Sequence, residues 1–180
     1  MFTKIKRKIR EWLQVERGGN TLLYEALDKG LQLGENVNLI SVPNFGSEPY
    51  LIKIGDNTTI SFDCAFVNHD AAAAVLGNMP GEDPQTGLFG PIVIGKNSFI
   101  GCRTTILANV HIGDNVIKGA DSVVNRDIPS NVVAAGVPCR VICTLDEYKA
   151  KHKDEFMYIN LFPYEEKKQY LMKVFGEELK

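Results

Sequence analysis

The chain has 180 residues, 44% of them hydrophobic, and a formal net charge of −2. This size and composition suit one folded domain with its own core. The charge argues against a general nucleic-acid binder, which would carry a basic surface, and no apolar run approaches the roughly 20 residues that cross a membrane. Four cysteines without a CxxC pair indicate free thiols and a reducing compartment, so we expect a cytoplasmic protein.

The first 30 residues are predicted to form an N-terminal helical segment. Residues 3–16 are expected to be an amphipathic helix, because their apolar residues recur at helical spacing among lysines and arginines. Two interpretations of this basic helix stay open. It packs over the open end of the following domain, or residues 2–13 make a weak contact with a membrane surface. A short second helix over residues 22–27 is expected to stop near Gly30.

A six-residue repeat organises residues 31–143. Its clearest part is an inward row of side chains at six-residue intervals, namely Ile94, Ile100, Ile106, Ile112, Lys118 and Val124. This period is typical of the hexapeptide β-helix, in which three units make one coil of about 18 residues and coils stack about 4.8 Å apart. Lys118 breaks the aliphatic row. We expect either that its stem packs while its ammonium reaches the rim, or that the register shifts by one residue.

A long insertion interrupts the repeat at residues 67–91. The six-residue period runs through Ile54, Ile60 and Phe66, stops, and resumes at Ile94. The insertion is too long for a turn between repeats, and long ordered loops in compact domains are usually functional. We therefore expect it to form part of a functional site.

The composition changes after residue 143. Residues 144–180 are charged and helix-prone, with Pro163 separating two predicted helical stretches. The expected organisation is a mainly β protein with three parts: a helical segment over 1–30, a β-helix over 31–143, and a C-terminal helical extension over 144–180.

The repeat region resembles a known enzyme family. The stretch FIGCRTTILANVHIGDN, followed by KGADSVV and DIPSNVVAAGVPCRVI, is similar to the hexapeptide-repeat acyltransferases, above all the galactoside and maltose O-acetyltransferases and the polysaccharide O-acetyltransferases. The resemblance covers roughly residues 50–143. It implies a left-handed parallel β-helix, a homotrimer with active sites at subunit interfaces, and acetyl-CoA as the acyl donor. No metal is expected.

The catalytic histidine of that family corresponds here to His69, in the stretch FVNHD at the start of the insertion. Transfer of an acetyl group from a thioester to an alcohol needs a base to take the hydroxyl proton, and imidazole suits this because it titrates near neutrality. The tetrahedral intermediate needs donors aimed at its oxyanion, which we expect to be backbone N–H groups. Asn68, Asp70 or a backbone carbonyl is expected to orient the ring.

The resemblance also implies that acetyl-CoA lies along the later coils. The implied contacts are Gly101, Cys102, Gly119, Ala120, Asn125, Arg126 and Arg140. The glycines would allow close backbone approach, and the two arginines suit phosphate groups. Cys102 is expected to be a small contact residue rather than a nucleophile, because direct transfer needs no covalent enzyme intermediate. Asp121 stands where the family usually has glycine, so it must tolerate a turn conformation that glycine accepts freely.

The acceptor is the least determined part of the expectation. Ser41 and Asn44 fall roughly where relatives place a polar acceptor-binding residue, and Asn68 and Asp70 flank the histidine, so we expect these four to contact the acceptor. The N-terminal region and the insertion depart from the family pattern. The identity of the acceptor therefore does not transfer.

The leading expectation is an acetyl-CoA-dependent O-acetyltransferase that acts on a hydroxyl of a sugar or polysaccharide precursor, with His69 as general base. Two alternatives stay open: an amino-sugar or xenobiotic N- or O-acetyltransferase of the same fold, and a non-catalytic β-helix scaffold. A zinc enzyme of the carbonic anhydrase type is disfavoured. It needs three convergent histidines, and His152 lies beyond the repeats.

Overall fold

The computed structural model describes residues 20–179. The basic helix expected over residues 3–16, and the membrane contact weighed for it, lie outside the described residues. The chain divides into two compact units, Met1–Leu145 and Asp146–Lys180, which are considered separately.

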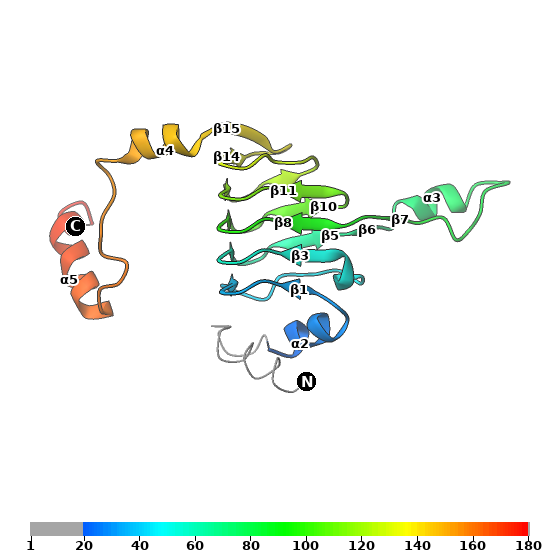
Figure 1. Cartoon of the computed structure of the whole chain (residues 1–180), viewed down its shortest axis with the longest axis horizontal. Helices are drawn as coiled ribbons and strands as arrows, with labels where there is room; N and C mark the ends of the chain where they lie inside the picture. Colours follow the sequence, from blue (N-terminus) through cyan, green and yellow to red (C-terminus); the bar gives the residue numbers. More distant parts are fainter. Residues whose placement is uncertain (1–19, 180) are drawn as a thin grey trace. The chain divides into compact units, whose positions relative to one another are not determined.

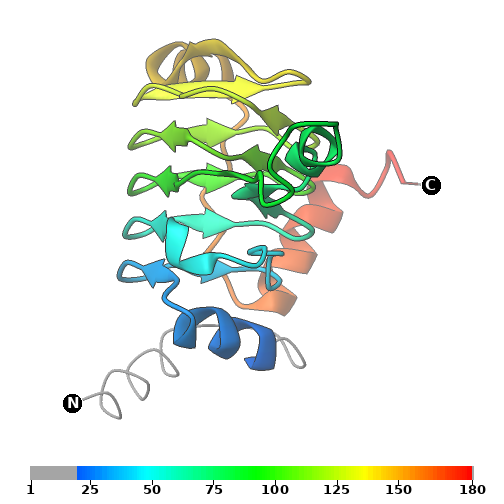
Figure 2. The ribbon, with the colours of Figure 1, turned by 90° about the vertical axis from the view of Figure 1, so that its right-hand side faces the viewer.

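The first unit is built on a parallel β-helix with three faces, shown from two directions in Figures 1 and 2. Its strands are β1 (Gln32–Leu33), β2 (Asn38–Leu39), β3 (Ile52–Ile54), β4 (Thr59–Ile60), β5 (Ala65–Val67), β8 (Ile92–Ile94), β9 (Phe99–Ile100), β10 (Thr105–Leu107), β11 (Val110–Ile112), β12 (Ile117–Lys118), β13 (Val123–Val124) and β14 (Val132–Ala135). With β15 (Arg140–Thr144), these strands form three sheets, ordered β1-β3-β8-β11, β13-β10-β5 and β15-β14-β12-β9-β4-β2. Val110 pairs with Ile92, so one uninterrupted coil takes 18 residues (110 − 92). The prediction of a mainly β chain with a hexapeptide period is confirmed.

The predicted inward row fills the interior of the coils. Its aliphatic members are at most 1% exposed; they are Ile94, Ile100, Ile106, Ile112 and Val124. Lys118 pairs with Ile100 in unbroken register and is itself 0% exposed. The register does not shift, so that expectation is wrong. The stem packs inside the coil as the other expectation held, but the ammonium does not reach the rim, because Nζ of this fully buried side chain donates to the Gly119 carbonyl at 3.2 Å.

The turns between strands depend on residues in the left-handed backbone region. One corner is a column of asparagines with φ between 53° and 63°: Asn36, Asn57, Asn97, Asn115 and Asn131. Asparagine enters this region more easily than most residues, and here the side-chain amides also bond from coil to coil, as from Asn97 to Asn115 at 2.7 Å. Asp121 has φ 52° in another turn, as its position in place of glycine required.

Both ends of the β-helix carry additional structure (Figure 1). Helix α2 (Asn20–Asp28) lies at the first coil and buries Leu23 and Ala26 in the core. It is followed by Gly30 at φ 104°, so the predicted short helix and its end are confirmed. At the other end, β15 (Arg140–Thr144) runs antiparallel to β14 and extends the six-stranded sheet.

The insertion leaves the coil as an arm, residues 69–89, that projects from the side of the β-helix (Figure 1). Its root is a two-stranded antiparallel ribbon of β6 (His69–Asp70) and β7 (Leu88–Phe89), and it carries the short helix α3 (Ala73–Gly77). After the arm, Ile92 pairs with Ile52 of the preceding coil. The coil therefore resumes in register, as the sequence period predicts.

The second unit contains α4 (Leu145–His152), which begins at the last residue of the first unit, and α5 (Tyr164–Phe175). Its aromatic contacts include Phe162 against Tyr170, with ring centroids 6.5 Å apart. Throughout residues 20–179, no helix combines the length and the apolar run that a membrane crossing requires.

Candidate active site

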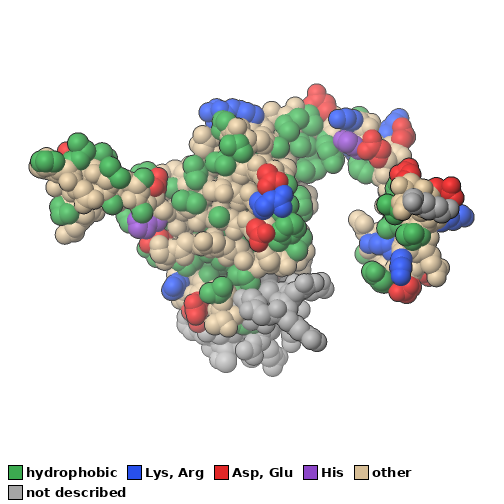
Figure 3. Space-filling model, turned by 180° about the vertical axis from the view of Figure 1, so that it is seen from behind, with side chains coloured by type: hydrophobic (Ala, Val, Ile, Leu, Met, Phe, Trp, Pro, Cys, Tyr) green, Lys and Arg blue, Asp and Glu red, His purple; other side chains and the backbone are tan. Residues whose placement is uncertain are grey.

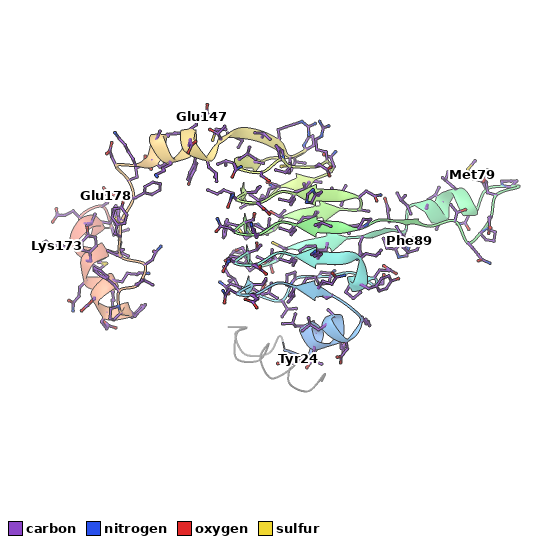
Figure 4. The ribbon with its side chains drawn as sticks, viewed as in Figure 1. Tyr24, Met79, Phe89, Glu147, Lys173 and Glu178 are labelled. Carbon is purple, nitrogen blue, oxygen red and sulfur yellow. The ribbon has the colours of Figure 1, made fainter. Side chains whose placement is uncertain are left out.

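His69 stands where the chain leaves the coil for the arm. It is the first residue of β6 and pairs with Phe89 across the ribbon. The two rings stack, with centroids 4.2 Å apart and planes at 25°. Figure 4 shows Phe89 at the root of the arm. One face of the imidazole is thus covered, yet the His69 side chain remains 33% exposed, which leaves it open to a substrate.

A second partner of His69 is Glu48, which sequence analysis missed. Glu48 precedes the 3-10 turn Pro49–Leu51, in the segment that interrupts the repeat between β2 and β3. Its Oε1 lies 3.5 Å from Nδ1 of His69, and its side chain is only 14% exposed. A carboxylate on Nδ1 favours the tautomer that leaves Nε2 free to accept a proton. The signal that could have found Glu48 is an acidic residue one coil before the histidine.

Asn68 lies behind His69 rather than beside an open surface. It is 0% exposed, and its Nδ2 donates to the Glu48 carbonyl at 2.7 Å. Asp70, on the other side, is exposed and accepts from the Ala72 N–H at 2.8 Å. The structure therefore uses Asn68 inside the fold and Asp70 to turn the chain into the arm; neither residue is the partner of the His69 ring.

Ser41 and Asn44 occupy different surroundings. The Ser41 hydroxyl accepts from the Asp63 N–H at 3.4 Å, which ties it to the next coil. Asn44 is exposed, and its side-chain oxygen accepts from the Gly46 N–H at 2.9 Å. Asn44 lines a hollow of about 410 Å³ between α2 and the segment 42–49, to which α2 contributes Glu25 and Lys29. Of these two predicted acceptor contacts, the structure brings Asn44 to an open hollow.

The residues of the middle coils that were predicted to contact acetyl-CoA lie together at one corner of the β-helix. The Gly101 N–H donates to the Lys118 carbonyl at 2.8 Å, and the Asp121 N–H to the Cys102 carbonyl at 2.9 Å, so residues 101–102 stack on residues 119–121. A β-carbon on Gly101 would come within 2.6 Å of the Ala120 nitrogen. The close approach that requires glycine at 101 is therefore the approach of the next coil.

The remaining residues predicted to contact acetyl-CoA lie on the surface of the last coils. Asn125 and Arg126 are exposed in the segment after β13, and Arg140 is exposed at the start of β15. The Arg140 guanidinium donates to the Cys139 carbonyl at 2.7 Å, which holds its stem along the coil. Cys102 is half-buried and, like the other three cysteines, forms no disulfide.

A metal centre finds no support in the described part of the chain. Between residues 20 and 179, no group of three or more His, Cys, Asp or Glu side chains is placed to hold an ion. His111 is exposed on β11, and His152 faces Glu155 in the second unit at 2.7 Å.

Comparison with known proteins places this chain in a family. A model of the bacterial transferase hexapeptide (six repeats) matches residues 91–126. Protein CapG of Staphylococcus aureus is 39% identical over 150 residues, which span 82% of this chain and 86% of CapG. The chain belongs to the hexapeptide-repeat acyltransferases. As a member of this family, it is a transferase rather than a zinc enzyme of the same fold.

Two further proteins are similar to this acyltransferase. The galactoside O-acetyltransferase of Escherichia coli (strain K12) is 55% identical over 107 residues, which cover 58% of this chain and 49% of that enzyme. A hexapeptide-repeat acetyltransferase from Vibrio cholerae O1 biovar eltor, solved in complex with acetyl coenzyme A, matches with a TM-score of 0.55 and 24% identity. That match covers 65% of this chain and 61% of the Vibrio chain, and it shows a shared fold.

Proposed function

We propose that this acyltransferase transfers an acetyl group from acetyl-CoA to a hydroxyl of a sugar or polysaccharide precursor, with His69 as general base. The observation that carries the proposal is the setting of His69, held between the Phe89 ring and the Glu48 carboxylate with its side chain still open. The similarity to an enzyme named galactoside O-acetyltransferase supports a sugar hydroxyl as the acceptor.

The proposed reaction is a direct transfer. Nε2 of His69 takes the proton of the acceptor hydroxyl while the hydroxyl oxygen attacks the thioester carbonyl carbon. Backbone N–H groups stabilise the oxyanion of the resulting tetrahedral intermediate. As the carbon–sulfur bond breaks, the imidazolium returns the proton to the departing thiolate. Glu48, facing Nδ1, holds the ring and stabilises the imidazolium between these two proton transfers.

The donor site is proposed along the later coils. Its residues are Gly101, Cys102, Gly119, Ala120, Asn125, Arg126 and Arg140. The exposed guanidinium groups of Arg126 and Arg140 support this assignment, since phosphates need charged, multiply donating partners. The acetyl-CoA complex of the Vibrio enzyme, which has the same fold, is consistent with it. Cys102 takes the part of a contact residue, and the proposed direct transfer gives it no covalent role.

For the acceptor we propose Asn44 as a contact, because it lines the open hollow beside α2. The arm is proposed to contact the acceptor as well, since its apolar side chains at Val75, Leu76 and Met79 are exposed; Figure 3 shows apolar side chains gathered on it. Ser41 and Asp70 remain weaker candidates, because their side chains already bond within the fold. Asn68 is buried, so we propose that it supports His69 from inside the fold and does not contact the acceptor.

The assembly and setting are proposed from the family resemblance. We propose a left-handed winding, an acyltransferase domain over residues 31–143 flanked by 1–30 and 144–180, and a homotrimer with active sites at subunit interfaces. The four free thiols support a reducing, cytoplasmic compartment.

The experiment that tests the function is thiol release from acetyl-CoA against a panel of simple sugars, nucleotide sugars, a polysaccharide fraction, amino sugars and chloramphenicol-like alcohols. We expect release with a sugar hydroxyl acceptor. Release with amino sugars or chloramphenicol-like alcohols alone would favour an amino-sugar or xenobiotic acetyltransferase. Binding of acetyl-CoA without release from any acceptor would favour a scaffold.

A further inference from the structure

We infer that Asn68 is a positioning residue of this site, which fixes Glu48 and Phe89 on two sides of His69. The kinetic consequence rests on the proposed function, whereas the structural consequence can be tested without it. Asn68 directly precedes His69 in the chain, so any contact it makes is transmitted to the histidine through a single peptide bond.

The side chain of Asn68 holds the Glu48 side of the site. Its Nδ2 donates to the Glu48 carbonyl at 2.7 Å and lies 3.5 Å from the Phe45 carbonyl. The Leu51 N–H donates to the same Glu48 carbonyl at 3.0 Å. Two donors thus fix the backbone from which the Glu48 carboxylate reaches Nδ1 of His69.

The backbone of Asn68 holds the Phe89 side. Its carbonyl accepts from the Gly90 N–H at 2.9 Å, which closes the ribbon at the residue next to Phe89. Because Phe89 stacks on the His69 ring, this bond sets the distance between the two strands that carry the stacked pair.

The Asn68 amide is not explained by stability of the fold alone. Its Oδ1 is buried and, in the described part of the chain, has no hydrogen-bond partner. The atom faces Gly46, where an added β-carbon would come within 2.7 Å of it. An orphaned buried acceptor costs stability, whereas an apolar side chain of similar shape would avoid that cost. A residue that lowers stability in this way is typical of a functional site. Here the Nδ2 end of the same amide donates to the Glu48 carbonyl.

A double-mutant cycle with Glu48 tests the inference. Asn68→Leu keeps the shape and removes the donor; we expect kcat to fall about tenfold with the KM for acetyl-CoA within about twofold. In a Glu48→Gln background the same change should cost less than about threefold, because Asn68 acts through Glu48. Losses that multiply, or a kcat of Asn68→Leu within about twofold of the parent, would overturn the inference. Asn68→Ser, shorter and still polar, replaces the variant if Asn68→Leu does not fold.

A matched control separates positioning from loss of stability. Thr58 is also 0% exposed, and its hydroxyl donates to the Gly95 carbonyl of the next coil at 2.9 Å. Thr58→Val removes this buried bond away from Glu48 and His69, so it should lower Tm while kcat stays unchanged. A kcat loss in Thr58→Val equal to that in Asn68→Leu would contradict a specific role for Asn68.

A crystal structure of Asn68→Leu gives a readout independent of activity. We expect the contact between His69 Nδ1 and Glu48 Oε1 to be lost. If the parent protein transfers no acetyl group, the proposed function fails, and this structure still decides the inference. Loss of the contact supports the positioning role of Asn68, and an unchanged contact overturns it.

Discussion

Glu48 and His69 face each other from neighbouring coils of the β-helix, with Oε1 and Nδ1 3.5 Å apart. Neither residue belongs to a regular repeat: Glu48 lies in the interruption before β3, and His69 opens the arm. The interruption before β3 and the root of the arm therefore lie side by side, which places the Glu48 carboxylate against the His69 imidazole. This pairing is the chemical basis of the predictions about the site.

Glu48→Gln is expected to lower kcat by about 10- to 100-fold, because the amide cannot stabilise the imidazolium that forms during transfer. The KM for acetyl-CoA should be unchanged, since Glu48 contacts the base. Steady-state kinetics with a saturating acceptor measure both. Glu35→Gln, which changes an exposed glutamate of the first coil outside the arm, is the matched control and should behave as the parent. A parental kcat in Glu48→Gln would remove Glu48 from the mechanism.

Phe89→Leu is expected to reduce kcat by about three- to tenfold, because the stacked ring that limits rotation of His69 is lost. Phe89→Tyr keeps the ring and should retain most of the activity. Measuring kcat of both variants in the same assay separates the effect of the stacked aromatic ring from the effect of an apolar side chain at position 89. Equal activity of the leucine and tyrosine variants would show that the stack does not position the histidine.

Lys118→Met is expected to stabilise the fold by about 1–2 kcal/mol at pH 7, because it replaces a buried amine by an apolar side chain of similar length. Burial lowers the pKa of Lys118 from its ordinary value of 10.5, so the unfolded chain binds more protons between the two pKa values. The stability of the parent therefore rises with pH in that window. Urea unfolding at pH 7 and at about pH 9 measures it.

The advantage of Lys118→Met should shrink as the pH rises through the folded-state pKa of Lys118 toward 10.5, because the variant lacks the titrating amine. The comparison stops near pH 9 because burial raises the pKa of the Cys64 thiol above its ordinary value of 9.0, so the stability of both proteins falls at higher pH. A constant difference between parent and variant from pH 7 to about pH 9 would show that Lys118 does not titrate in this range.

Asp121→Asn is expected to leave Tm nearly unchanged, while Asp121→Ala lowers it. The Arg103 guanidinium bonds both carboxylate oxygens of Asp121 and holds the pKa of that carboxyl below its usual value. The pair is exposed, so solvent screens it and its net contribution is small. The backbone φ of 52° matters more, and asparagine tolerates it where alanine does not. Thermal unfolding of the two variants checks this order; equal Tm values would contradict it.

The depressed pKa of Asp121 also sets an acid limit. Its contribution to stability is present above the ordinary carboxyl value of 3.8 and is lost as the pH falls through the lower folded value. Asp121→Asn should lack this acid-dependent loss.

The sequence period predicted the parts of the fold that repeat, and it did so through sterics. Ile94 and Ile100 had to point inward because each six-residue unit forms one side of the coil and turns the same position of the unit toward the interior, although the two residues lie in different sheets. Lys118 follows the same geometry despite its amine. The period therefore predicted the position of this side chain correctly, whereas its charge suggested an ammonium at the rim. The left-handed corner at Asp121 was also predictable, since the coil needs that conformation whichever residue stands there.

The site was less accessible to sequence reasoning. His69 was found because it opens an insertion and matches the catalytic histidine of a family that the sequence resembles. Glu48 lies 21 positions earlier (69 − 48), the same offset at which Asn38 pairs with Thr59, but it stands in a segment where the six-residue period is broken, so the period did not single it out. Phe89 is brought back by the length of the arm, which the sequence does not fix. Asn68 was expected to contact the acceptor, and only the structure shows that its amide points inward to the Glu48 carbonyl.

The most direct measurement is acetyl transfer by His69→Ala, made together with calorimetric binding of acetyl-CoA. If His69 is the general base, turnover with the accepted hydroxyl falls by about 100-fold or more while acetyl-CoA affinity stays within about twofold of the parent. Undiminished turnover with unchanged binding would contradict the account, because the residue between Glu48 and Phe89 would then take no part in the chemistry.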